Sequence, residues 1–100
     1  MTDQPQSTET FFSINQWQRE TFPAATLDGS LRHVEEEWIE FQMAPSIDER
    51  VKEAVDLILT LTCYVDLATG RGAQGPIDAK MRICRSRKWI ILPDGTGRHA

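Results

Sequence analysis

The sequence predicts an all-α fold: a small helical bundle, built on an antiparallel helix hairpin, in a single domain of 100 residues. Apolar residues recur at three- and four-residue steps along most of the chain, which is the period of an amphipathic helix. Serine, threonine, proline and glycine stand where such helices would begin or end. A possible strand over residues 89–92 is too short to found a sheet.

The N-terminal part is expected to be a loose arm followed by a short helix. Residues 1–10 are polar and show no helical period. Ser13 and Gln16 have the spacing of a capping box, so the first helix should run over about residues 14–22. Pro23 would stop it, because proline cannot continue a helix without losing a hydrogen bond.

Two longer helices are expected over about residues 26–43 and 46–69, with a break at Pro45 between them. Ser46 and Glu49 form a capping-box pattern at the start of the second. Apolar residues surround most of that helix, which is typical of the most buried helix of a bundle. The other carries one stripe that should face the core: Leu27, Leu31, Val34, Trp38 and Phe41.

A fourth helix is expected over about residues 77–89, with Pro76 in its first turn. The tail over residues 93–100 contains Pro93-Asp94-Gly95 and should consist of turns. The chain is therefore read as one domain, flanked by the arm and by this tail.

Charge is distributed unevenly in a chain whose net formal charge is −4. Residues 31–60 contain eight acidic and three basic residues, whereas residues 71–100 contain seven basic and two acidic residues. An acidic middle suits a cation, and a basic end suits phosphate or nucleic acid.

The sequence indicates a cytoplasmic protein. Cys63 and Cys84 lack the spacing of metal or redox motifs and are expected to be reduced thiols. Residues 1–10 show no secretory signal, and the longest apolar run, residues 57–65, is too short to cross a bilayer.

Two pairs of acidic residues should meet across the expected hairpin. Each pair has a three-residue spacing, which places its members on one side of a helix. The short link makes the two helices antiparallel neighbours, and the pairs lie at matching distances from it. Four carboxylates should therefore lie level with one another: Glu37, Glu40, Glu53 and Asp56.

Carboxylates gathered in this way would not all ionise without a cation. Oxygen ligands of this kind suit Mg²⁺, or Mn²⁺ as its substitute, and helix bundles hold metals through side chains of facing helices. Glu36 lies farther from the interface and could be a fifth ligand or a base for water. His33, one turn before Glu37, could touch metal or phosphate but is expected to be structural. A solvated acidic face is the alternative, although no lysine or arginine interleaves Glu36, Glu37 and Glu40 at four-residue spacing.

The pattern Glu36-Glu37-x-x-Glu40 followed by Glu53-x-x-Asp56 resembles the EExxE…ExxD signature of the MazG-like superfamily, which are all-α nucleoside triphosphate pyrophosphohydrolases. Three further blocks resemble its subgroup of short, MazZ-like dATP/dGTP diphosphohydrolases, over roughly residues 12–99. The blocks are Phe12-Ser13-Ile14-Asn15-Gln16-Trp17 with Thr21-Phe22, then Leu31-Arg32-His33-Val34-x-x-Glu37-x-x-Glu40, and Lys80-Met81, Arg87, Trp89 and Pro93-Asp94-Gly95. The chain departs from the subgroup at Cys84, where asparagine is usual.

The resemblance implies hydrolysis of a deoxynucleoside triphosphate to its monophosphate and pyrophosphate, with Mg²⁺. It makes dGTP the first expected substrate and dATP the second, and it connects dGTP hydrolysis with phages that replace adenine by 2-aminoadenine. A phage protein of this kind would act in the cytoplasm of its host. The resemblance also implies a homo-oligomer, dimer or tetramer, with sites near subunit interfaces.

The candidate site residues fall into three groups. The metal ligands are Glu37, Glu40, Glu53 and Asp56, and the catalytic set is Glu36, Glu37 and Glu40. Lys80 and Arg87 are seven residues apart, which would place them on one face of the fourth helix. They could hold the departing pyrophosphate. For contacts with the base, the resemblance favours Ile14, Asn15 and Trp17.

Two alternatives stay open at this point. One is a pyrophosphatase that clears another nucleotide, such as dUTP or dCTP, with the same carboxylates. The other is a helical interaction module without activity, whose basic C-terminal third binds nucleic acid; the acidic net charge argues against it.

Overall fold

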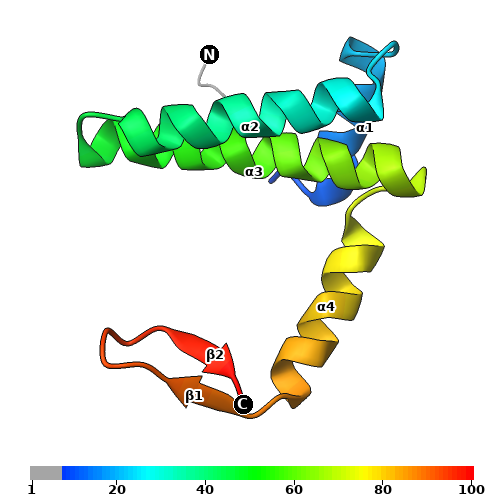
Figure 1. Cartoon of the computed structure of the whole chain (residues 1–100). Coiled ribbons are helices and arrows are strands. Elements are labelled where there is room, and N and C mark those ends of the chain that lie inside the picture. Colours follow the sequence, from blue (N-terminus) through cyan, green and yellow to red (C-terminus); the bar gives the residue numbers. More distant parts are fainter. Residues whose placement is uncertain (1–7) are drawn as a thin grey trace, which may run out of the picture.

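The computed structural model of the protein describes residues 8–100, which form four helices and a β-hairpin (Figure 1). Residues 1–7, most of the expected arm, lie outside the described residues. The elements are α1 (Phe11–Thr21), α2 (Leu27–Met43), α3 (Ile47–Thr69), α4 (Gln74–Ser86), β1 (Trp89–Ile91) and β2 (Gly97–His99).

The central feature is the antiparallel hairpin of α2 and α3, whose bounds agree with the sequence prediction to within about a residue. The hydroxyl of Thr26 caps α2 by accepting from the Gly29 N–H at 3.1 Å. Ser46 caps α3 in the same way, accepting from Glu49 N–H at 3.1 Å. Gly70 ends α3 at a φ of +70°, a left-handed conformation that glycine adopts without steric cost. Local signals therefore define both ends of α3.

Helix α1 begins three residues earlier than predicted, so the expected capping box of Ser13 with Gln16 is wrong. Thr10 is the N-cap: its hydroxyl accepts from Ser13 N–H at 3.0 Å, and its own N–H donates to the Ser13 hydroxyl at 2.8 Å. Ser13 thus takes the third position of the box, a place usually held by glutamate or glutamine.

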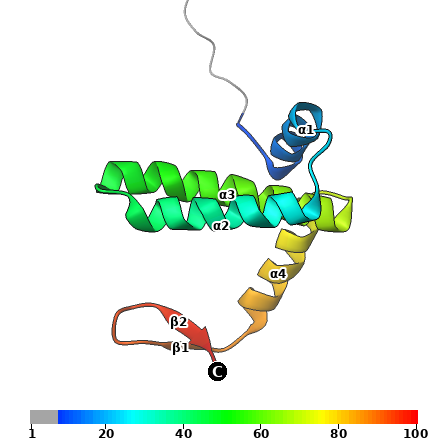
Figure 2. The ribbon, with the colours of Figure 1, turned by 45° about the horizontal axis from the view of Figure 1, so that its top comes forward.

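Helix α1 lies against α3 (Figure 2), and an ion pair and side-chain hydrogen bonds join the two helices. Arg19 pairs with Asp66 through two nitrogens, and its Nε lies 2.9 Å from Asp66 Oδ2. Gln18 donates to the carbonyl of Leu59 at 2.8 Å. Asn15 donates to a second α3 carbonyl, 3.3 Å away. These side chains satisfy buried polar groups and so fix the position of α1 on the hairpin.

Helix α4 is shifted toward the N-terminus relative to the prediction, beginning at Gln74 and ending at Ser86. Pro76 lies in its first turn, as expected. The helix ends early because Arg87 has an extended backbone, with ψ of 152°, and leads directly into β1.

Residues 89–92 were predicted to be too short to form a sheet, and residues 93–100 to contain only turns. Both predictions are wrong. Strand β1 pairs antiparallel with β2, and Trp89 lies opposite His99. Between the strands, Asp94 Oδ1 accepts from Thr96 N–H at 3.0 Å, and Gly95 has a φ of +89°. Each strand has only three residues, so neither strand would be stable without the other.

The predicted burial of α2 and α3 is wrong for the single chain. In residues 8–100 the only buried apolar residues are Ala44 and Ala73, while Trp38 of the α2 stripe is 49 % exposed and Val51 of α3 is 58 % exposed. The radius of gyration is 16.4 Å, against about 13 Å for a compact domain of this length. Within residues 8–100, the apolar faces of the hairpin are therefore only partly covered.

None of the helices in residues 8–100 combines the length and the apolar character that crossing a membrane requires.

The Arg19–Asp66 pair should contribute to stability. Replacing Asp66 by asparagine should lower the free energy of unfolding by about 1–2 kcal/mol at neutral pH, since Asp66 is buried but Arg19 is partly solvated. The hydrogen bond from Arg19 lowers the pKa of Asp66. The contribution is therefore complete above the ordinary aspartate pKa and is lost as pH falls through the lowered value.

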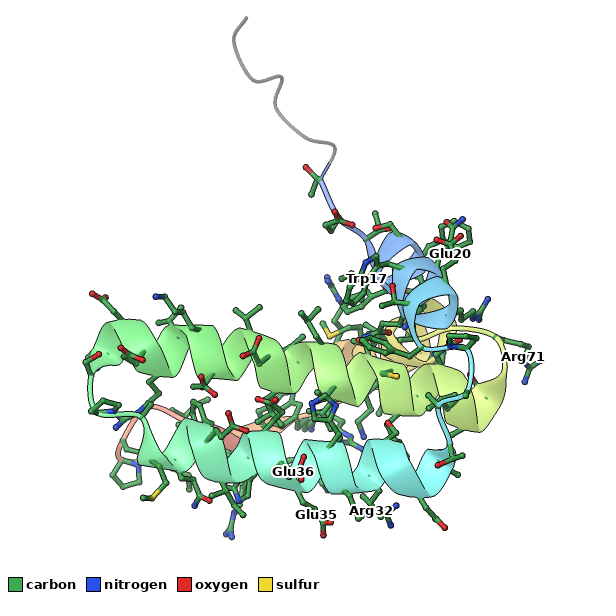
Figure 3. All side chains as sticks on the ribbon, turned by 90° about the horizontal axis from the view of Figure 1, so that it is seen from above. Trp17, Glu20, Arg32, Glu35, Glu36 and Arg71 are labelled. Carbon is green, nitrogen blue, oxygen red and sulfur yellow. The ribbon has the colours of Figure 1, made fainter. Side chains whose placement is uncertain are left out.

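Urea unfolding of wild-type and Asp66→Asn protein across pH 2–7 measures this difference. The exposed Glu20, which points away from the hairpin in Figure 3, gives a matched control as Glu20→Gln. Equal stability of Asp66→Asn and the control at neutral pH would show that the pair does not hold α1.

Candidate functional site

The hairpin brings three acidic side chains together where the sequence predicted their convergence. One carboxylate oxygen each from Glu37, Glu40 and Glu53 lies within 4.8 Å of the other two. The first two come from α2 and the third from α3, so the group spans the helix interface. Three negative charges this close repel one another unless a proton or a cation compensates them.

Two oxygens of this carboxylate group are buried without any hydrogen-bond partner: Oε2 of Glu37 and Oε2 of Glu53. A buried polar atom without a partner costs free energy, and buried polar groups in proteins are nearly always satisfied. The donor set therefore fits a hard divalent cation, for which carboxylate oxygens are the preferred ligands.

The pKa of Glu53 is raised above its ordinary value. Desolvation is the largest cause, followed by the negative charges of Glu40, Asp56, Glu37 and Glu49. A divalent cation would act in the opposite direction by favouring the ionised form.

Asp56 and Glu36 lie outside the close group. Asp56 contributes to the raised pKa of Glu53 and, together with Glu37, lines the neighbouring cavity. Glu36 is exposed on α2. His33, one turn before Glu37, has its Nε2 3.3 Å from Glu37 Oε1.

A cavity of about 780 Å³ extends from these carboxylates along the groove between α2 and α3. On one wall, lining residues recur at three- and four-residue steps from Thr26, the N-cap of α2, to Glu37. These two residues are separated by about 16 Å along the helix axis. Facing residues of α3, from Asp56 to Cys63, form the other wall. The volume lies within the range of small-molecule sites.

Helix α1 and the segment after it cover the end of the cavity remote from the carboxylates. Trp17, labelled in Figure 3, is 55 % exposed. It packs edge-to-face against Phe22, with ring centroids 5.6 Å apart. Ser30 and Thr60 line the groove on opposite helices. The cavity thus joins an aromatic wall to an acidic end. Four lining residues were not predicted from the sequence: Phe22, Ser30, Thr60 and Cys63. The three-residue spacing of Thr60 and Cys63, which places them on one side of a helix, is visible in the chain.

The other sequence-predicted residues are placed differently. The side-chain amide of Asn15 is engaged within the protein: its nitrogen donates to Gln18 Oε1 and to Thr62 O, and its Oδ1 accepts from Ala73 N–H. A contact of Asn15 with a base would therefore require exchanging these hydrogen bonds. Ile14 is half-buried and is not among the residues that line the cavity.

The predicted shared helical face of Lys80 and Arg87 is wrong, because α4 ends at Ser86. Lys80 is exposed on α4, and Arg87 Nη1 lies 3.4 Å from His99 Nδ1. Figure 1 shows α4 and the β-hairpin extending away from the α2–α3 hairpin. Within one chain, these cations and the carboxylate group belong to different parts of the molecule.

A solved structure of the cyanophage S-2L MazG-like pyrophosphohydrolase, bound to dGDP and three catalytic Mn²⁺ ions per active site, is similar to this chain. The TM-score is 0.64 at 24 % sequence identity, and the match covers 93 % of this chain and 99 % of that one. No family model matches the sequence, and no curated protein does. The structural likeness shows that the chain has a MazG-like all-α fold, with a β-hairpin added to the helices.

Divalent ions should stabilise the protein. Mn²⁺ or Mg²⁺ at a hundred times its Kd should add about 2.7 kcal/mol to the free energy of unfolding. The raised pKa of Glu53 means that the metal-free protein loses stability as pH rises through that pKa, so the gain from the metal should grow with pH.

Thermal unfolding in EDTA and in excess Mn²⁺, from pH 4 to 8, measures this gain. Glu53→Gln should raise the Tm in EDTA, because it removes a repelled charge, and should abolish most of the Mn²⁺ effect. Glu35→Gln, at an exposed position that points away from α3 in Figure 3, should behave as wild type. An unchanged Mn²⁺ response in Glu53→Gln would exclude the carboxylate group as the metal site.

Proposed function

We propose that the protein is a divalent-metal-dependent nucleoside triphosphate pyrophosphohydrolase that acts on dGTP, with dATP as the second substrate. The observation that carries the proposal is the close carboxylate group, with two buried unpartnered oxygens, at one end of a cavity of about 780 Å³. The likeness to a pyrophosphohydrolase bound to dGDP and Mn²⁺ supports the reaction class and the guanine base.

Four residues would hold Mg²⁺, or Mn²⁺ in its place: Glu37, Glu40, Glu53 and Asp56. The ion, when bound, supplies positive charge against the phosphates and lowers the pKa of a water nucleophile. The protein contributes the spacing of the carboxylates, which the two helices fix before substrate arrives.

The reaction proceeds by attack of water on the α-phosphorus and cleavage of the bond between that phosphorus and the oxygen bridging to the β-phosphorus. The bridging oxygen leaves with pyrophosphate, and the products are dGMP and pyrophosphate. Glu36, which is exposed on α2 next to Glu37 in the chain, would accept the proton of the attacking water.

The aromatic end of the cavity would receive the base. Trp17 offers a flat apolar surface beside the groove, which suits stacking on a purine. Asn15 and Ile14 would then support the base pocket from behind Trp17, and Asn15 would contact the base only by exchanging its present partners. With dGTP as substrate, the protein would supply dGMP to a phage pathway for 2-aminoadenine.

The working unit would be a homo-oligomer, a dimer or a tetramer. Large apolar side chains stay exposed on the hairpin, on α4 and on β1. The basic C-terminal third and the acidic middle of the chain have complementary charges. Because α4 and the β-hairpin extend away from α2 and α3 (Figure 1), Lys80 on α4 and Arg87 at its end would hold pyrophosphate in the site of a second copy.

Activity should depend on metal and on the carboxylate group. A screen of the common ribo- and deoxynucleoside triphosphates with Mg²⁺ should show pyrophosphate release, highest with dGTP, and EDTA should stop it. Glu37→Gln should lower kcat by at least about a hundredfold, because it removes a ligand of the ion whose positive charge would act at the phosphates.

Product analysis by ³¹P NMR, with Glu35→Gln as the control variant, completes this test. Orthophosphate and dGDP as products would indicate attack at the γ-phosphorus, contrary to the proposal. Turnover in EDTA would exclude the metal mechanism, and preference for dUTP or dCTP would indicate a pyrophosphatase of different base specificity. Salt-sensitive DNA binding without hydrolysis would favour an interaction module.

The oligomer should be stable at micromolar concentration. Light scattering coupled to size-exclusion chromatography should give a mass of at least twice the 11.4 kDa of one chain. Trp38→Glu, which places a charge on the exposed apolar face of α2, should lower that mass and the Tm together. A folded wild-type monomer under the same conditions would contradict the oligomer.

A further inference from the structure

We infer that His33 is a positioning residue for Glu37: it contacts one oxygen of the carboxylate, while the other oxygen is buried without a hydrogen-bond partner. This inference rests on the proposed metal-dependent function, and it gives His33 a role that the sequence pattern did not. His33 does not touch the reacting atoms; it acts through Glu37.

The contact follows from helix geometry. His33 precedes Glu37 by four residues on α2, so the two side chains are neighbours on one face. His33 Nε2 lies 3.3 Å from Glu37 Oε1. The histidine side chain is 58 % exposed, whereas that of Glu37 is 13 % exposed, so an accessible residue holds a largely enclosed carboxylate.

The two oxygens of Glu37 have different surroundings. Oε1 faces His33, while Oε2 is buried without a hydrogen-bond partner. In residues 8–100, His33 is the one basic side chain with a nitrogen in contact with the carboxylate group, and the Arg19–Asp66 ion pair lies elsewhere.

A glutamate side chain has three rotatable bonds, and fixing it costs conformational entropy. A partner on Oε1 restricts the carboxylate before any ion arrives, so less conformational entropy would be lost when Glu37 binds an ion. Groups that hold metal ligands in this way change metal affinity typically by ten- to a hundredfold when they are removed.

His33 also lines the cavity, so direct contact with the substrate is the competing role. The two roles differ in what they change. A positioning residue alters the affinity for metal when no nucleotide is present. A substrate contact alters the KM for nucleotide and leaves the affinity for metal alone.

The test is a titration of the full-length protein with Mn²⁺, without nucleotide, in which the electron paramagnetic resonance signal reports free Mn²⁺. His33→Ala should weaken Mn²⁺ binding by about tenfold. His33→Gln should restore most of it, because its amide N–H can donate to the same oxygen. Arg32→Ala is the matched control, since Arg32 is the preceding residue on α2 and points away from α3 in Figure 3. It should bind Mn²⁺ as wild type does.

Turnover provides a second readout. At saturating Mn²⁺, His33→Ala should recover a kcat close to that of wild type, with little change in the KM for dGTP. Wild-type Mn²⁺ affinity in His33→Ala, accompanied by a raised KM, would overturn the inference and assign His33 to the substrate. Absence of Mn²⁺ binding in the wild-type protein would overturn the proposed metal site, and the role of His33 with it.

Discussion

Mutual repulsion of carboxylates across the α2–α3 interface is the constraint on which the rest of the structure depends. Folding brings Glu37, Glu40 and Glu53 within 4.8 Å of one another and leaves two of their oxygens buried without partners. Sequence-local features impose this arrangement, because the caps at Thr26 and Ser46 fix where each helix begins. A cation bound between the carboxylates would remove this repulsion. Its binding would be more favourable because folding has already brought the ligands together.

Few apolar side chains are buried in residues 8–100. Helix α1 is held on α3 by Arg19–Asp66 and by amide contacts, while large apolar side chains remain at the surface. Residues 8–100 therefore have a polar framework but little hydrophobic core, and the proposed oligomer would supply the missing burial. This division of roles explains how a site between two helices can be preformed although the chain that carries it is not compact.

Much of the fold could be predicted from the sequence because the relevant signals are local. The bounds of α2 and α3 follow from capping residues and a short link, and the carboxylate group follows from residue spacing on those two helices. The β-hairpin could not be predicted, since three-residue strands gain stability only by pairing with each other across Asp94–Thr96. The burial of the apolar stripe on α2 was also predicted incorrectly. The helical period shows which residues form an apolar face, but it does not show whether the same chain packs against that face. The extended backbone of Arg87, which separates it from the face of Lys80, likewise depends on the strand that follows.

The most direct test of this account is a crystal structure with Mn²⁺ and a non-hydrolysable dGTP analogue, recorded so that anomalous scattering locates the metal. Anomalous density is expected between the carboxylates of Glu37, Glu40, Glu53 and Asp56, with the triphosphate at the same end of the cavity and the base beside Trp17. Carboxylates paired instead with arginine or lysine side chains of a second copy, with no density between them, would contradict it.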